Sequence, residues 1–284
     1  MKSHIVSLIV IVGVVSTASL SAADTIVERG QYLVTTIGAC GNCHSPRQGE
    51  LIGGTIIPGT ELSGGAELDE DIGHLSMPNI TSDTDTGIGQ WTNAQIVTSL
   101  GDGKRPDGKI LGPPMPIPVY RNLSDNDASA IATYLLTLKP VNHAVPRSVY
   151  KIPLPENYGP PVTHLDEPSP TDQVTYGKYL VTFGHCVLCH TPTGRDQPFD
   201  MSRAFAGGRK LPNESVSRNI TSDPEDGLGK WTDEQIKVAI TEGKRPDGTA
   251  LNRIMAFDWY KVITQPDLES IVVYLRTIPP QKTP

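Results

Sequence analysis

Four cysteines form two pairs in this chain, and a histidine directly follows each pair. The two segments, 40–44 and 186–190, both read Cys-x-x-Cys-His. Two thiols about one helical turn apart can bond to the two vinyl groups of one porphyrin, and the imidazole four positions after the first thiol lies on the same side of the turn. The spacing therefore predicts two covalently attached haem c groups, with these residues: Cys40, Cys43, Cys186 and Cys189 as attachment points, and His44 and His190 as axial ligands of iron.

Three other uses of paired cysteines fit this sequence less well. A zinc site usually takes its four ligands from two close pairs about 12–20 residues apart, whereas these pairs are 146 positions apart. A thioredoxin-like redox pair follows a strand in a βαβ unit, and neither flanking segment has that pattern. A network of structural disulfides gives no reason for a histidine after both pairs.

The first 23 residues have the features of a secretory signal peptide. A positive charge at Lys2 precedes an apolar run over 5–15, and the small residues at 21–23 suit cleavage after Ala23. The run is too short for a stable membrane span, so an uncleaved anchor is the lesser alternative. We expect a periplasmic protein, either free or held on the outer face of the inner membrane through a partner.

The charge and composition exclude some partners. Without Lys2, the chain keeps 23 basic and 31 acidic residues, a formal charge of −8. Such a chain is unsuited to nucleic acid or anionic lipid as its main partner. With 27 Gly and 25 Pro against four Phe, the domains should be rich in loops, and a porphyrin would supply apolar area that the side chains lack.

An internal repeat organises the remainder of the chain. Three blocks return at an offset of 140: Asn-Ile-Thr-Ser-Asp at 79 and 219, Gly-x-Gly-x-Trp-Thr at 87 and 227, and Gly-Lys-Arg-Pro-Asp-Gly at 103 and 243. A single length change in the Gly-rich stretch 45–78 would explain the larger offset of the cysteine motifs. The repeat predicts domains at 24–139 and 171–284, joined by a proline-rich linker over 140–170 that should be extended and semi-rigid.

The two halves share one order of predicted helices. Capping signals place helix starts near Thr25, Thr92 and Ser124 in the first half, and near Asp172, Thr232 and Pro266 in the second. Gly30 and Gly177 could let the first and last helices of each half cross closely, near Tyr134 and Tyr274. Because no alternating pattern of useful length is present, we predict an all-α fold.

The sixth ligand of each iron decides between electron transfer and catalysis. Of the methionines after the signal peptide, Met115 and Met255 are offset by 140 and lie in equivalent loops before the last helix, whereas Met77 and Met201 have no counterpart. We therefore predict Met115 and Met255 as axial ligands, since a thioether favours Fe(II) and raises the reduction potential. His74 is the first substitute for the ligand in the first half.

Two further pairs of matched residues are candidates for haem contacts. Trp91 and Trp231 either fill the core or donate an indole hydrogen bond to a propionate. Arg105 and Arg245, each preceded by lysine, either neutralise propionates or belong to solvated turns before Pro-Asp-Gly, and we favour the solvated turns.

The order of helix, Cys-x-x-Cys-His, methionine loop and final helix resembles class I cytochrome c, present twice in tandem. The repeated blocks resemble more closely the cytochrome c subunits of periplasmic alcohol, aldehyde and sugar-acid dehydrogenases. This resemblance implies an electron-transfer protein rather than an enzyme, with a dehydrogenase subunit as donor and an oxidase or another cytochrome as acceptor. The alternatives are a dihaem peroxidase or sulfur-compound-oxidising enzyme, against which the two matched methionines argue, and a haem sensor or structural subunit, for which no signalling segment is seen.

Overall fold

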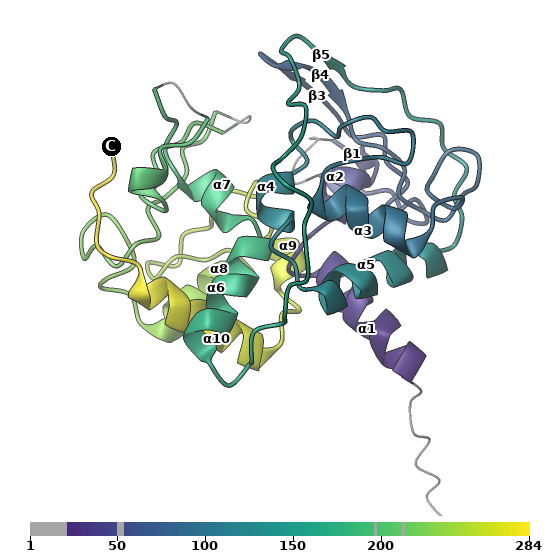
Figure 1. Cartoon of the computed structure of the whole chain (residues 1–284). Coiled ribbons are helices and arrows are strands. Elements are labelled where there is room, and N and C mark those ends of the chain that lie inside the picture. Colours follow the sequence, from purple (N-terminus) through teal and green to yellow (C-terminus); the bar gives the residue numbers. More distant parts are fainter. Residues whose placement is uncertain (1–21, 50–53, 196–197, 212–213) are drawn as a thin grey trace, which may run out of the picture.

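The helices form two sets that repeat in the same order along the chain (Figure 1). The computed structural model describes residues 22–49, 54–195, 198–211 and 214–284, so residues 1–21 of the predicted signal peptide lie outside it. The first set is α1 (Ala22–Thr35), α2 (Gly41–His44), α3 (Asn93–Gly101), α4 (Ile117–Tyr120) and α5 (Asp125–Thr137). The second is α6 (Gln173–Phe183), α7 (Cys186–His190), α8 (Asp233–Glu242), α9 (Phe257–Tyr260) and α10 (Gln265–Thr277), with a short 3₁₀ turn at Met201–Arg203.

The helix starts follow the capping chemistry of the sequence. The capping boxes predicted at Thr92 and Thr232 form: the Thr92 hydroxyl accepts from the Gln95 N–H, the Gln95 side chain accepts from the Thr92 N–H, and the same pair recurs at Thr232. Such boxes satisfy N–H groups that have no partner inside a helix. The first helix is already present at Ala22, before the predicted start near Thr25.

Glycine allows the first and last helices of each half to cross in contact. A Cβ atom built on Gly30 of α1 would lie 2.0 Å from the Ala130 carbonyl oxygen of α5, and one built on Gly177 of α6 would lie 1.9 Å from the Ser270 carbonyl oxygen of α10. No side chain fits at that distance, so the predicted role of both glycines is confirmed. Each crossing also passes Tyr134 or Tyr274, as expected.

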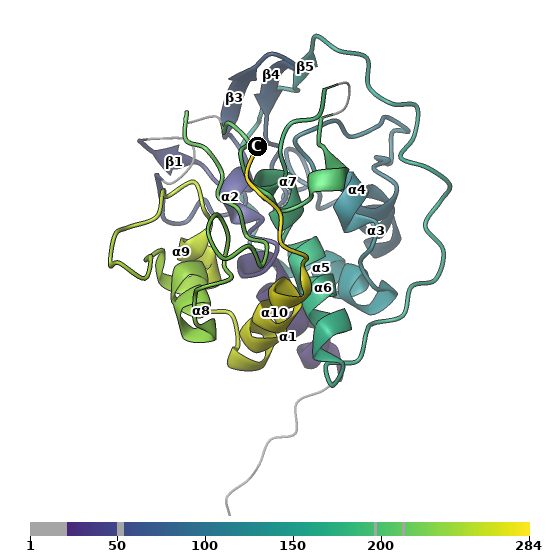
Figure 2. The same cartoon turned by 90° about the vertical axis from the view of Figure 1, so that its left-hand side faces the viewer.

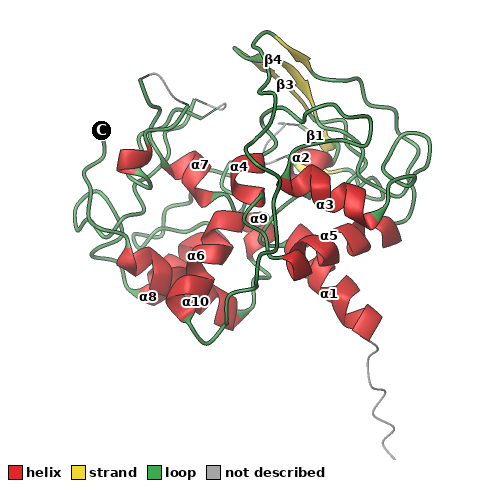
Figure 3. Cartoon of the chain, viewed as in Figure 1, coloured by secondary structure: helices red, strands yellow, loops and turns green. Residues whose placement is uncertain are grey.

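The prediction of an all-α fold needs one correction, because short strands are present in a mainly helical chain (Figure 3). The strands are β1 (Arg47–Gln48), β2 (Thr55–Ile56), β3 (Glu67–Glu70), β4 (Gly73–Ser76) and β5 (Val149–Tyr150). β1 pairs with β2, and β4 lies between β3 and β5, all antiparallel. These pairings are only two to four residues long, too short for an alternating pattern to reveal.

The length difference between the halves has two parts rather than the single one predicted. Gly64 and Gly207 are equivalent, because their N–H groups donate to the carbonyls of His44 and His190 respectively. Twenty positions separate the first pair and 17 the second, so three of the six extra residues precede Gly64. The other three follow it, in the stretch that contains the β3–β4 hairpin, where the described residues of the second half form an isolated bridge between Lys210 and Val216.

The proline-rich segment 140–170 is extended but lies bound along the first half. β5 joins the sheet, the Tyr150 hydroxyl donates to the Pro113 carbonyl (2.9 Å), and the Tyr158 hydroxyl donates to the Leu111 carbonyl (2.7 Å). Farther on, the Asp125 N–H at the start of α5 donates to the Leu165 carbonyl (3.0 Å). Figure 2 shows this teal segment passing along the outside of the molecule from β5 toward α6. The segment therefore connects the halves and is also held along the surface of the first half; we call residues 140–170 the strap.

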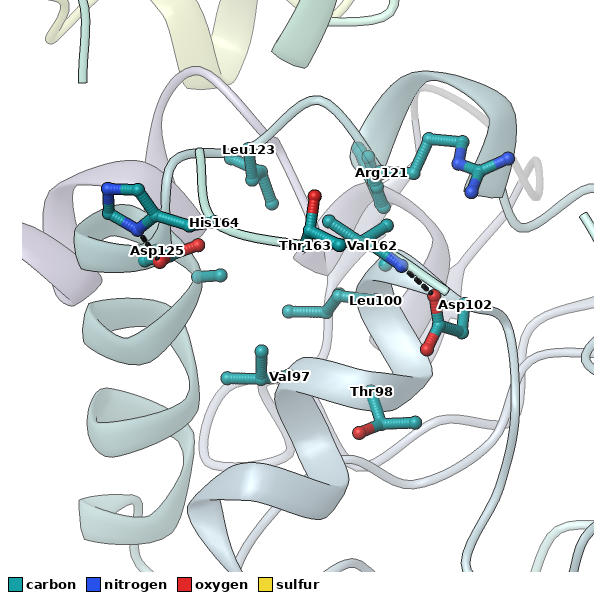
Figure 4. A pocket seen from close by; sticks show the side chains of 13 residues that line it. Val97, Thr98, Leu100, Asp102, Arg121, Leu123, Asp125, Val162, Thr163 and His164 are labelled. Carbon is teal, nitrogen blue, oxygen red and sulfur yellow. Dashed lines mark hydrogen bonds and ion pairs between the residues drawn. The ribbon is translucent and has the colours of Figure 1, made fainter. Parts of the chain in front are cut away.

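A surface pocket of about 280 Å³ lies where this strap crosses α3 and α5 (Figure 4). Leu100 and Leu123 line it, and two of its polar contacts join the strap to α3 and α5. The Val162 N–H donates to Asp102 (2.8 Å), and the His164 ring bonds to Asp125 (2.5 Å). Neither cysteine motif contributes to the lining, so the pocket belongs to the strap.

One buried core runs through both halves. The same cluster of packed apolar side chains includes Leu33 and Ile131 of the first half and Leu180 and Ile271 of the second. In the part of the chain that the structure describes, no helix combines the length and apolar character that crossing a bilayer requires.

Candidate haem attachment sites

Both cysteine motifs lie on short helices that follow a left-handed residue. Ala39 has φ +43° and His185 has φ +46°, at matched positions directly before the first cysteine of each motif. All four described cysteines have free thiols, with Cys40 and Cys186 half-buried and Cys43 and Cys189 exposed. The motifs therefore present their thiols in the same way in the two halves.

The two histidines of the motifs have the same hydrogen bond. His44 Nδ1 lies 2.8 Å from the Pro78 carbonyl oxygen, and His190 Nδ1 lies 2.7 Å from the Arg218 carbonyl oxygen. A carbonyl can only accept, so Nδ1 carries the proton and Nε2 keeps the lone pair that a metal needs. Burial lowers the pKa of both imidazoles despite these bonds, which favours the neutral, ligating form.

The repeated Asn-Ile-Thr-Ser-Asp block holds these carbonyls in place. The Asn79 side-chain oxygen accepts from the Thr81 N–H (2.9 Å), while its amide donates to the Val141 carbonyl (2.8 Å). Asn219 makes the same bonds to Thr221 (2.9 Å) and to the Gln281 carbonyl (2.7 Å). Because each asparagine directly follows the residue whose carbonyl binds the histidine, the block orients the imidazole through its backbone.

The matched methionines, Met115 and Met255, lie in equivalent loops before α4 and α9. Their carbonyls accept from Ile117 N–H (2.9 Å) and Phe257 N–H (2.8 Å), and both side chains are half-buried against the core that holds Cys40 and Cys186. The two methionines therefore have matching surroundings.

The other candidate ligands have different surroundings. Met77 is buried in the small core beneath the β3–β4 hairpin, and Met201 is 59% exposed. His74 is bonded to Asp69 on the same hairpin (2.9 Å). Met77 and His74 therefore belong to the hairpin and the small core beneath it, and Met201 lies at the surface.

The donor sets of both halves fit a covalently bound haem. Each half brings two free thiols and an imidazole with a free Nε2 onto one short helix, and a thioether lies in the matched loop. Residues 27–139 also match the family model of cytochrome c. Residues 27–139 belong to the cytochrome c family.

Several curated relatives of this cytochrome align with most of its length. It is 30% identical over 281 residues to the cytochrome c subunit of alcohol dehydrogenase (quinone) from Gluconacetobacter polyoxogenes, covering 91% of this chain and 57% of the relative. It is 28% identical to the gluconate 2-dehydrogenase cytochrome c subunit of Pantoea cypripedii, covering 95% and 64%. It is also 28% identical to a diheme cytochrome c-type protein of Cereibacter sphaeroides, covering 85% and 82%.

The chain spans less than two thirds of the length of the dehydrogenase subunits named above. Membership in the cytochrome c family implies covalent haem c, and two Cys-x-x-Cys-His motifs are consistent with two such groups.

The matched arginines of this cytochrome differ between the halves. The Arg105 guanidinium carbon lies 5.8 Å from the centre of the Trp91 ring, and Arg105 Nε, 3.4 Å from Asp107, forms no hydrogen bond among the described residues. Arg245 instead donates to Thr249 (3.1 Å) and to the Ala250 carbonyl (2.9 Å). Arg105 Nε is therefore buried without a hydrogen bond among the described residues, whereas Arg245 is bonded within its own turn.

Sequence reasoning missed the side chains that join the two halves. The Tyr32 hydroxyl of α1 donates to Asp267 at the start of α10 (2.7 Å), and the Tyr179 hydroxyl of α6 donates to Asp127 at the start of α5 (2.6 Å). Both tyrosines and both aspartates have counterparts in the repeat, and this matching was the signal by which the sequence could have identified them. The pairs are exchanged between the halves, so each half supplies one donor and one acceptor.

Proposed function

We propose that this chain is a dihaem c-type cytochrome that transfers electrons as part of a periplasmic dehydrogenase system. The observation that supports this proposal most directly is the matched pair of imidazoles, His44 and His190. In each, Nδ1 is hydrogen-bonded to a backbone carbonyl and Nε2 is free. Two equivalent sites with the same donor set suit one-electron relay better than a single catalytic iron.

In this proposal the chain's own residues attach and orient two haem groups. The four cysteines would hold the haem groups covalently, and His44 with Met115 and His190 with Met255 would be the ligands of the two irons. When bound, each haem supplies a one-electron Fe(III)/Fe(II) couple. A methionine on the sixth position leaves no open site for a substrate, so the chain serves as a carrier rather than as a catalytic subunit.

The partners follow from the relatives. Those relatives are named as cytochrome c subunits of alcohol and gluconate dehydrogenases, so a dehydrogenase subunit is the proposed donor. An oxidase or another cytochrome is the proposed acceptor. The periplasm is the proposed location, with any attachment to the membrane made through a partner. The proposed domains are 24–139 and 171–284.

An optical and EPR spectrum of the purified holoprotein tests this function. We expect two low-spin haem c groups per chain, with a charge-transfer band from methionine sulfur to ferric iron. A high-spin, five-coordinate signal from either haem would contradict the relay and would indicate a dihaem enzyme instead.

A further inference from the structure

A tryptophan of the second half lies directly on the cysteine motif of the first. A Cβ atom built on Gly41 would lie 2.3 Å from Cη2 of the Trp259 indole. Only glycine therefore lets the indole rest on this backbone. Gly41 is the first residue between Cys40 and Cys43, so the contact joins α9 of the second half to the haem motif of the first.

A tyrosine of the first half in turn contacts residues just before the second motif. Tyr120 is buried, and its ring centre lies 5.5 Å from that of Phe183 and 6.2 Å from that of His185. Both partners lie within three positions before the second motif. Tyr260, the counterpart of Tyr120, places its hydroxyl 3.4 Å from the Gly184 carbonyl oxygen. The space between the motifs is thus filled by side chains of both halves.

The electrostatic neighbours of the two tyrosines agree with this placement. Burial raises the pKa of Tyr120 and of Tyr260, and each phenol is close enough to the cysteines of its own half for them to raise it further. Tyr260 also contributes to the raised pKa of Tyr120. Both tyrosines belong to the buried cluster that the two halves share.

The repeat shows that the Trp259–Gly41 contact is specific to one side. The counterpart of Trp259 is Val119, and the counterpart of Gly41 is Val187. One side thus combines a large and a small residue, where the other has two residues of intermediate size. Interiors are close-packed, so the sum of the two volumes matters more than either volume alone.

We propose that Trp259, seated on Gly41, is a positioning residue that fixes the spacing of the two haem attachment sites, so that an electron crosses between the halves within one chain. This inference rests on the proposed dihaem function. The exchanged Tyr32–Asp267 and Tyr179–Asp127 bonds also join the same two halves. Because these contacts fix the two halves relative to one another, electron transfer between them requires no movement of the proline-rich strap.

Three variants of the holoprotein test this inference. Gly41→Val should displace Trp259, Trp259→Val should leave a gap, and the double variant should restore the fit, because it copies the valine pair of the other side. The readouts are the exciton couplet of the Soret circular dichroism, which reports the relative geometry of two haems, and the rate at which one photo-injected electron equilibrates between them. Haem content per chain is measured for each variant.

In Gly41→Val we expect a changed couplet and equilibration slower by severalfold, because the rate of electron transfer falls steeply with the distance between the two redox centres. The double variant should recover most of both. An unchanged couplet and rate in Gly41→Val would overturn the inference.

Trp259→Val provides an equivalent test if Gly41→Val fails to fold or to retain haem: a changed couplet and slower transfer support the inference, and unchanged values overturn it. A wild-type protein without two low-spin haems would instead overturn the proposed function, so the two failures can be told apart.

Discussion

At the scale of single residues, the repeat identified side chains but not the backbone groups that act on them. The cysteine spacing and the 140-residue offset were enough to select His44, His190, Met115 and Met255 as candidates. The carbonyls at 78 and 218 were not predictable, because any residue has a carbonyl and only the folded loop aims it at an imidazole.

The matched methionines give the first prediction at this scale. Met115→Ala and Met255→Ala should each lower the potential of one haem by on the order of 0.1 V, a fraction of the roughly 0.8 V range that axial ligands set. A spectroelectrochemical titration measures both potentials. Met77→Ala and Met201→Ala are the matched controls and should change neither. A methionine whose loss leaves both potentials unchanged is not an axial ligand.

The exchanged tyrosines, Tyr32 and Tyr179, give a second prediction at the scale of single residues. Tyr32→Phe should lower the free energy of unfolding by about 2–3 kcal/mol, and Tyr179→Phe by about 1–2 kcal/mol. The difference arises because Asp127 keeps its ion pair with Arg29 (2.7 Å), whereas Asp267, 8% exposed, has no other side-chain partner in the described ranges. Denaturant titration of the two variants checks the order, and equal losses would contradict it.

At the scale of elements, helices were predictable and the strap was not. Capping boxes and glycines act on neighbours a few positions away or at helical spacing, so the sequence carries their signal. The strap is held by tyrosine hydroxyls on the carbonyls at 111 and 113, about 40 positions away. Proline content correctly indicated an extended chain but could not show where it lies.

The strap can be loosened at one glycine. A Cβ atom built on Gly112 would lie 2.5 Å from Cζ of Tyr150. Gly112→Ala should therefore weaken local docking of the strap by about 1–3 kcal/mol, the usual effect of overpacking. Limited proteolysis should then cut within 140–170 faster than in the wild type. Gly101→Ala is the control: its Cβ would lie 3.3 Å from a methyl group of Val162, which can shift, so cleavage should stay near the wild-type rate.

At the scale of the whole molecule, the repeat predicted two equivalent halves, while the joint between them was visible only in three dimensions. Leu33 and Leu180 look like core residues of separate domains, yet they belong to one continuous cluster. Sequence periodicity reports which face of a helix is apolar, and it does not report whether that face is shared with another domain.

A continuous core predicts a single unfolding event. Calorimetry of the holoprotein should give one transition whose calorimetric and van't Hoff enthalpies agree, because neither half can open without exposing the apolar surface of the other. Two resolved transitions in the wild type would show that the halves unfold independently. In that case the shared core contributes little to stability.

The exchanged tyrosine–aspartate pairs have a consequence for each half taken separately. Each half carries one tyrosine and one aspartate of the pairs, which makes its joining face self-complementary, like the surface of a symmetric dimer. Covalent connection through residues 140–170 replaces an association that would depend on protein concentration by an internal one, with a high effective concentration set by the connecting chain. The two cysteine motifs thereby stay paired at any dilution.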